Sequence, residues 1–387
     1  MRTVRADVVR MGVIGAGRMA RIGHLHWLAR HPSVRIVGIA DTRLAAARDA
    51  ARRYHAEGAF SSGEELLEKA KPHAVVVCTP PWHHKEAVVS AARNKVHVLC
   101  EKPMALTARD CGKMIKECSE NEVFLRVGFV NRFDPGFMKV KELIRRGDAG
   151  RIFHMTAAFH MYLPDPDTPP LKQVFDAARA LGLKDEDIGI WRTRDPRAGG
   201  VLADLGVHMI DLMRWFAGEN VTNVSGSVQK VAGGRVNEDH AACFLTFESG
   251  AAADIQAGLC RLTGIEFKIH GEVHGSRMSL GFTQDASWFM KGPPLYYNVY
   301  AHVKKYTRLS IATRRWYPVA VLHGRNYFMC KQQTDNFIKT VTGKGGGHPG
   351  VGEWWAATGE DGLEAVRIVE RIYRDSGRKP GSGAGGG

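Results

Sequence analysis

The 387-residue sequence lacks the features by which membrane, metal-binding and disulfide-linked proteins are usually recognised. No segment approaches the roughly 18 consecutive apolar residues of a membrane span. The seven cysteines include no CxxC pair, and the histidines at 24, 26, 83 and 84 are not followed by ligands at metal spacing, so we expect no metal site. The opening residues contain no apolar stretch that ends in a small-residue cleavage site, which favours the cytoplasm.

Acidic residues are absent from 286–331, where eight lysines and arginines carry more than half of the net charge of +14. Trp and Tyr residues are interleaved with these cations. No recognised nucleic-acid-binding module is present and the rest of the chain is only mildly basic, so we expect neither a nucleic-acid nor a membrane partner. Two interpretations stay open: a solvated lobe that contacts a sister subunit, or a pocket cover that stacks on sugar rings and receives a carboxylate or phosphate.

The length of 387 residues predicts two domains, because a single hydrophobic core does not keep growing to that size. The first third of the chain is typical of a nucleotide-binding unit. Gly15, Gly17 and Ala20 have GxGxxA spacing between a strand and a helix. The first glycine allows a tight turn, the second lets a pyrophosphate approach the backbone, and the small third residue packs helix on strand. The helix amino end, with Arg18 and Met19, then faces the phosphates.

An acidic residue follows at the position that reads the ribose. Asp41 closes the second strand 21 residues after Ala20 and can accept both ribose hydroxyls, which favours NAD over NADP. Arg43 can hold a 2′-phosphate or stack on the adenine of NAD, so NADP stays open as a cofactor. The structural alternative makes Asp41 a turn residue that caps the helix beginning near Leu44.

Helices and buried strands alternate up to residue 130, which predicts a parallel, doubly wound sheet of the α/β class. The patterns predict helices at 44–55, 63–70, 83–94 and 107–121, and strands at 74–78, 97–100 and 123–130. Ligands of such sheets bind beyond the carboxyl ends of the strands, where the segments TPPWHH (79–84) and EKP (101–103) lie.

Residues 199–215, GGVLADLGVHMIDLMRW, place a carboxylate and an imidazole on one predicted helix. Counted at about 3.6 residues per turn, Asp204, His208, Asp211 and Trp215 fall at i, i+4, i+7 and i+11, which is one stripe. Leucines and methionines form a broader apolar surface on the same helix. The polar stripe is therefore expected to border a core or a cavity.

Taken together, these motifs resemble the Gfo/Idh/MocA family of sugar and cyclitol oxidoreductases. The resemblance also covers 131–152, 191–200 and 359–378, so it spans nearly the whole chain in the right order. It implies a Rossmann domain over 1–128 and a substrate-binding and oligomerisation α/β domain over 129–358.

In the family, that second domain holds a large, open, mainly antiparallel sheet, whose face often mediates dimer or tetramer contacts. The resemblance thus implies a homodimer or homotetramer, and a helix over 359–376 that returns to pack near the first domain. The tail 377–387 has no apolar content with which to fold and is predicted to be disordered.

The resemblance also implies roles for individual residues. Lys102 of EKP matches the lysine beside the nicotinamide and the reacting carbon, and Pro103 is compatible with a cis peptide bond there. His208 matches the general base or acid, and Asp204 the residue that holds a substrate hydroxyl and the lysine. The chemistry agrees, because a histidine pKa near 6.5 suits proton transfer and an ammonium stabilises an alkoxide.

The remaining site residues implied by the resemblance border the cofactor or the substrate. The cofactor set adds Thr79, Pro80, His84 and Glu101. The substrate set adds Arg132, Trp191 and Arg192.

Three functions are compatible with the sequence. The favoured one is an NAD(P)-dependent dehydrogenase that oxidises a secondary alcohol of a sugar, cyclitol or glycoside. In the second, tightly bound NAD oxidises the substrate transiently, which acidifies a neighbouring C–H for glycoside cleavage or elimination. The third, a nucleotide sensor without catalysis, is disfavoured because Lys102, Asp204 and His208 are all present, although the fold alone does not decide.

Overall fold

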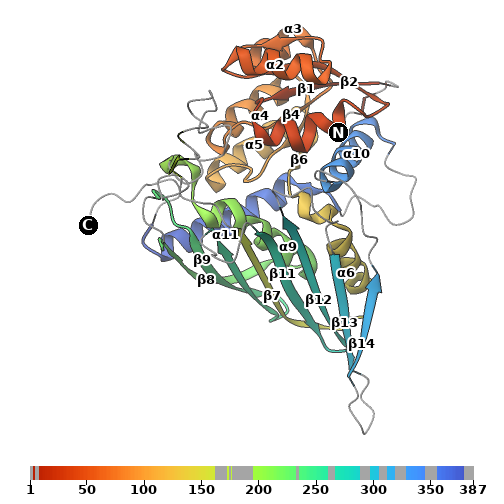
Figure 1. Ribbon diagram of the computed structural model, residues 1–387, viewed down its shortest axis with the longest axis vertical. Helices are drawn as coiled ribbons and strands as arrows, with labels where there is room; N and C mark the ends of the chain where they lie inside the picture. Colours follow the sequence, from red (N-terminus) through yellow and green to blue (C-terminus); the bar gives the residue numbers. More distant parts are fainter. Residues whose placement is uncertain are drawn as a thin grey trace. The chain divides into compact units, whose positions relative to one another are not determined.

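In the computed structural model the chain forms two compact units (Figure 1). The described residues are 3–4, 8–161, 172–173, 176, 195–231, 235–259, 266–287, 297–304, 312–318, 328–344 and 355–378. Of these, the first unit contains those up to 133, 328–344 and 355–367, and the second contains the others. The sequence assigns 129–358 to one domain, whereas the structure groups 328–344 and 355–358 with the first unit.

A seven-stranded sheet of order β15-β6-β5-β4-β1-β2-β3 organises the first unit. Its strands are β1 (Val9–Ile14), β2 (Val34–Ala40), β3 (Ala59–Phe60), β4 (Ala74–Val77), β5 (His97–Cys100), β6 (Leu125–Val127) and β15 (Ala357–Thr358). All neighbours are parallel except β15, which pairs antiparallel with β6. The predicted parallel sheet is confirmed, and the strand order reverses at β1, between β2 and β4, where such sheets bind ligands.

The helices of the first unit include two that begin at polar capping residues. They are η1 (Ala20–Leu25), α1 (His26–Leu28), α2 (Leu44–Tyr54), α3 (Gly63–Ala70), η2 (Pro81–His83), α4 (His84–Arg93), α5 (Ala108–Glu120), η3 (Val130–Phe133) and α10 (Phe328–Thr342). Ser62 accepts a hydrogen bond from the Glu65 N–H before α3, and Thr107 accepts one from Asp110 N–H before α5. The four predicted helices are confirmed to within two residues at each end, whereas β6 is shorter than the predicted strand 123–130.

The helix α10 belongs to the first unit because its apolar side joins that unit's core. Phe337, Ile338 and Val341 are buried in the same hydrophobic cluster as Met11 and Val13 of β1. The predicted domain boundary differs from the observed one because α10 buries its apolar side chains against the parallel sheet.

The second unit contains an eight-stranded sheet of order β14-β13-β12-β11-β7-β10-β9-β8. Its strands are β7 (Ile152–Met161), β8 (Val221–Gln229), β9 (His240–Phe247), β10 (Ala252–Gly258), β11 (Glu266–Gly275), β12 (Met278–Ser287), β13 (Tyr297–Lys304) and β14 (Ala312–Pro318). Only the pairing of β7 with β10 is parallel in this described sheet. The expected large, open and mainly antiparallel sheet is confirmed.

Helices cover one face of this sheet (Figure 1). They include α6 (Pro135–Arg145) and α9 (Val207–Ala217), which contact each other and the strands, and α9 is preceded by η4 (Pro196–Ala198) and η5 (Leu202–Gly206). The helix α11 (Gly359–Asp375) contributes residues to both units. Of the basic aromatic segment 286–331, β13 and β14 form one sheet edge, while 288–296, 305–311 and 319–327 lie outside the described residues.

Candidate active site

The glycine loop after β1 has the backbone geometry that a dinucleotide needs. Gly15 has φ +98°, and a Cβ on it would lie 2.7 Å from the backbone of Cys78, so only glycine fits this turn. At Gly17 no described heavy atom lies within 4 Å of the position a Cβ would take, which leaves room for a pyrophosphate. Ala20 is fully buried in the core cluster. These residues fit a bound dinucleotide in the way that the GxGxxA spacing predicts.

Asp41 connects the end of β2 to the glycine loop. One carboxylate oxygen accepts a hydrogen bond from the Ala16 N–H at 2.8 Å, and the other accepts from the Arg43 N–H at 2.9 Å. The Arg43 Nε lies 3.6 Å from the same carboxylate. Arg43 is itself the N-cap residue of α2 and makes no side-chain cap bond. Asp41 therefore lies beside the loop where a ribose would bind rather than capping α2.

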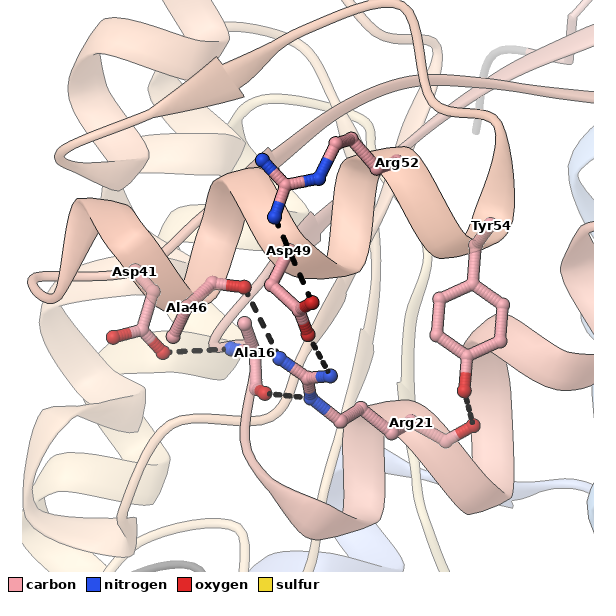
Figure 2. A network of polar contacts seen from close by, with 7 residues as sticks. All are labelled: Ala16, Arg21, Asp41, Ala46, Asp49, Arg52 and Tyr54. Atoms are coloured by element: carbon pink, nitrogen blue, oxygen red, sulfur yellow. Dashed lines mark hydrogen bonds and ion pairs between the residues drawn. The ribbon is translucent and has the colours of Figure 1, made fainter. Parts of the chain in front are cut away.

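Arg21 ties the same loop to α2 from the other side (Figure 2). Its guanidinium donates to the Ala16 carbonyl at 2.9 Å, to the Ala46 carbonyl at 3.1 Å and to the Asp49 carboxylate at 2.6 Å. The hydrogen bond from Arg21 lowers the pKa of Asp49. Ala16 is thus held through its N–H by Asp41 and through its carbonyl by Arg21.

We expect Arg21→Met to raise the Kd for NAD about tenfold, because a hydrogen bond from a charged donor contributes about 1.5–3 kcal/mol and Ala16 would lose one. The control is Arg52→Met, since Arg52 lies 3.8 Å from the same Asp49 carboxylate but is 77% exposed. NAD titration by calorimetry measures both constants. Equal affinity in the two variants would show that the Arg21 network is not needed to hold the loop.

The loop that carries Lys102 is fixed by a buried hydrogen bond between His24 and Glu101. The Lys102–Pro103 peptide bond is cis, which confirms the expectation from the EKP motif. The His24 Nε2 lies 2.8 Å from one Glu101 carboxylate oxygen, and the other oxygen accepts from the Lys102 N–H at 3.1 Å. Burial alone would raise the pKa of Glu101, but the hydrogen bond to His24 and the charge of Lys102 lower it. An ionised Glu101 therefore holds the backbone of Lys102.

His84 links the two loops that follow β4 and β5. Its Nε2 lies 2.8 Å from the Thr79 carbonyl and its Nδ1 lies 3.0 Å from the Pro103 carbonyl. Burial lowers the pKa of His84, which favours the neutral ring. Both ring nitrogens thus face backbone rather than open space. The Thr79 hydroxyl is buried and has no hydrogen-bond partner among the described residues, so it can serve a cofactor.

Of the residues predicted to bind the substrate, the structure describes Arg132, Asp204 and His208. Arg132 is buried in the first unit, where its guanidinium forms an ion pair with Asp361 at 3.2 Å. Asp204 and His208 lie in the second unit. Trp191 and Arg192 lie outside the described residues.

The helix that carries Asp204 and His208 contains a π turn. Asp204 lies in this turn, η5, and is half-buried, whereas His208 lies in α9 and is buried, with its ring 6.0 Å from that of Phe159. A π turn closes i→i+5 hydrogen bonds, so it interrupts the 3.6-residue period. The predicted stripe therefore holds from His208 to Asp211 and Trp215, but the predicted α-helical spacing between Asp204 and His208 is wrong.

Four polar residues near the proposed site were not predicted from the sequence: Arg21, His24, Glu238 and Tyr373. A second π turn, η1, carries His24 directly after the glycine loop.

Among the described residues, no group of His, Cys, Asp and Glu could hold a metal ion. None of the helices in the described ranges has the length and apolar content to cross a membrane.

Comparison with known proteins identifies the family. Residues 9–129 match the oxidoreductase family with an NAD-binding Rossmann fold, and residues 137–280 match the Gfo/Idh/MocA C-terminal domain. A myo-inositol 2-dehydrogenase of Thermotoga maritima is 32% identical over 275 residues, which are 70% of this chain and 73% of that protein. The chain belongs to the Gfo/Idh/MocA family. It is an oxidoreductase, and its cofactor is NAD.

Other relatives extend the similarity. A D-glucoside 3-dehydrogenase of Escherichia coli is 27% identical over 210 residues, 54% of each chain. The solved structure of a levoglucosan dehydrogenase in complex with NADH and L-sorbose matches with a TM-score of 0.76 at 20% identity, over 96% of this chain and 97% of that one. At that identity the structural likeness establishes the fold.

Proposed function

We propose that this oxidoreductase oxidises a secondary alcohol of a sugar, cyclitol or glycoside, with reduction of the ketone as the reverse reaction. We base this on Lys102, whose loop is held in place by hydrogen bonds that involve Glu101, His24 and His84. The similarity to an inositol dehydrogenase and a glucoside dehydrogenase supports the substrate class.

We assign the cofactor to the residues that line the glycine loop and the adjoining strand ends. Bound NAD supplies the hydride acceptor. Gly15 and Gly17 leave space for its pyrophosphate, and Asp41 accepts the ribose hydroxyls. The other proposed contacts are from Arg18, Met19, Arg43, Thr79, Pro80, His84, Glu101 and Lys102.

We assign the proton chemistry to three side chains. His208 removes the hydroxyl proton in oxidation and returns it in reduction, since its ordinary pKa lies near neutrality. The Lys102 ammonium stabilises the developing alkoxide, and Asp204 holds a second substrate hydroxyl. Arg132, Trp191 and Arg192 complete the proposed substrate set.

We further propose a cytoplasmic homodimer or homotetramer of carbohydrate metabolism. The face of the second sheet opposite α6 and α9 carries the exposed Phe244 and half-buried histidines such as His154 and His274. Association through this face would bury Phe244. Sedimentation of the purified protein measures the assembly directly.

A substrate screen tests the proposed function. The purified protein is mixed with NAD or NADP and with inositols, free sugars or glycosides, and the absorbance of the reduced cofactor is followed. We expect reduction of NAD with at least one polyol that carries a ring CH–OH. Absence of cofactor reduction and of substrate loss across all three classes would contradict the substrate assignment.

A further inference from the structure

A buried carboxyl and a buried phenol meet at the start of the helix that carries Asp204 and His208. Tyr373 donates a hydrogen bond to Glu238 with an oxygen–oxygen distance of 2.5 Å. Both side chains are buried, and both lie in the second unit. They come from distant parts of the chain, since Glu238 precedes β9 and Tyr373 lies in α11.

Glu238 makes contacts with three consecutive residues at this helix start. Its carboxylate accepts from the Leu202 N–H at 3.2 Å, and its backbone carbonyl accepts from the Val201 N–H at 3.1 Å. The first N–H groups of a helix have no partner inside it, and negative charge near them is stabilising. At Gly200, with φ +97°, a Cβ would overlap the Glu238 carboxyl, so the backbone is packed directly against it.

These contacts reach Asp204 through one further hydrogen bond. The Asp204 N–H donates to the Gly200 carbonyl at 3.0 Å. The Tyr373 hydroxyl also lies 3.3 Å from the Gly199 carbonyl. Glu238 and Tyr373 therefore both contact the backbone turn that precedes Asp204.

The charge of Glu238 is sensitive to pH in the neutral range. Burial raises the pKa of Glu238 to about 7, against the hydrogen bonds from Tyr373 and Leu202 and the charge of Arg378, which lower it. The pKa of Tyr373 lies well above its usual range because of burial. The neighbouring Arg235 and Asp239 pair with each other at 3.7 Å. The ionised Glu238 accepts both hydrogen bonds, whereas the protonated form is itself a donor.

We propose that Glu238 and Tyr373 are positioning residues for the proton-transfer helix, holding the turn 199–203 and through it Asp204. The inference rests on the proposed function, since it assigns Asp204 and His208 to the reaction. The ionised Glu238 is the form that holds the turn. Catalysis then requires Glu238 to be ionised and His208 to be neutral in the oxidation direction.

The test compares Glu238→Gln and Tyr373→Phe with Asp239→Asn. Asp239 is the matched control, because it is an equally buried carboxylate one residue away whose side chain bonds to the Val231 N–H and pairs with Arg235. We expect Glu238→Gln to lower kcat at least about tenfold, a loss of ~1.4 kcal/mol, with the Kd for NAD within twofold of wild type. Asp239→Asn is expected to retain the wild-type pH profile.

The pH profile separates positioning from a general loss of stability. The Tyr373 hydrogen bond lowers the pKa of Glu238, so Tyr373→Phe should move the rising limb of kcat to higher pH. Glu238→Gln should remove that limb. Wild-type profiles in both variants, or a change in kcat matched by Asp239→Asn, would overturn the proposal.

Hydrogen exchange gives a readout that needs no activity. We expect faster exchange of the Leu202 amide in Glu238→Gln than in Asp239→Asn, because the carboxylate acceptor of that N–H is changed. Unchanged exchange at Leu202 would overturn the proposal even in an active enzyme. If the wild-type protein oxidises no alcohol, the proposed function fails, and the exchange still reports whether Glu238 holds the turn.

The pH dependence of the melting temperature gives a further test of the charge of Glu238. A buried carboxyl whose folded pKa is raised gives its full stabilisation below the unfolded pKa of about 4.3 and loses it as pH rises through the folded pKa. The folded pKa of Glu238 is about 7. The Tm of Glu238→Gln relative to wild type should therefore rise between about pH 5 and pH 8. A relative Tm that is constant over this range would show that Glu238 does not change its charge there.

Discussion

Lys102→Met and His208→Asn are expected to lower kcat by about a thousandfold or more, while the Kd for NAD stays within a few-fold of wild type. General acid–base catalysis typically contributes about 10²–10⁴ in rate, and loss of one electrostatic donor to a developing oxyanion costs about 10²–10³. Neither side chain is needed to hold the pyrophosphate, which fits against Gly15 and Gly17. Initial rates with the best alcohol and NAD titration by calorimetry measure the two quantities.

Substitutions of the same chemical kind outside the site provide the controls. Lys113→Met on the exposed side of α5 and His240→Asn on β9 should leave kcat unchanged. Asp204→Ala should raise KM more than it lowers kcat, in keeping with a residue that holds a hydroxyl. Activity of the Lys102 or His208 variant within about tenfold of wild type, a loss of only ~1.4 kcal/mol, would remove that residue from the mechanism.

Asp41 is expected to make the enzyme prefer NAD to NADP. We expect kcat/KM with NAD to exceed that with NADP by about a hundredfold or more, because the Asp41 carboxylate would repel a 2′-phosphate. Two unit charges about 4 Å apart interact with about 4 kcal/mol at the dielectric of a protein surface. The carboxylate is held in place by the Ala16 and Arg43 N–H groups.

Asp41→Asn tests the charge and keeps the side-chain shape. The variant should gain activity with NADP, since the repulsion is removed and the Arg43 guanidinium, now 3.6 Å from the carboxylate, can bind the phosphate. The ratio of kcat/KM for the two cofactors is measured in both proteins. A wild-type preference for NADP would contradict the interpretation that Asp41 repels a 2′-phosphate.

The elements of the first unit could be predicted because their signals are local. Continuous apolar runs such as 74–78 indicated the buried strands, and caps such as Ser62 and Thr107 lie next to the helices that they begin. The open sheet of the second unit was expected from the family resemblance rather than from its own pattern. The π turn at Asp204 was missed because counting residues along a chain presupposes a fixed 3.6-residue period.

Contacts between distant residues could not be predicted from one sequence. His24 and Glu101 are 77 positions apart, and Glu238 and Tyr373 are 135 positions apart. No pattern within a strand or helix shows that such side chains meet in the core. The apolar stripe of α10 likewise indicates burial but not that its partner is the parallel sheet.

The ratio of NADH formed to substrate consumed distinguishes net oxidation of the alcohol from transient oxidation. With the best alcohol from the screen and NAD in excess, we expect one equivalent of NADH and one of ketone for each equivalent of substrate lost. Wild-type enzyme, Lys102→Met and a blank without enzyme are followed side by side. Substrate loss while the cofactor spectrum returns to its starting state would contradict net oxidation and establish transient oxidation by tightly bound NAD instead.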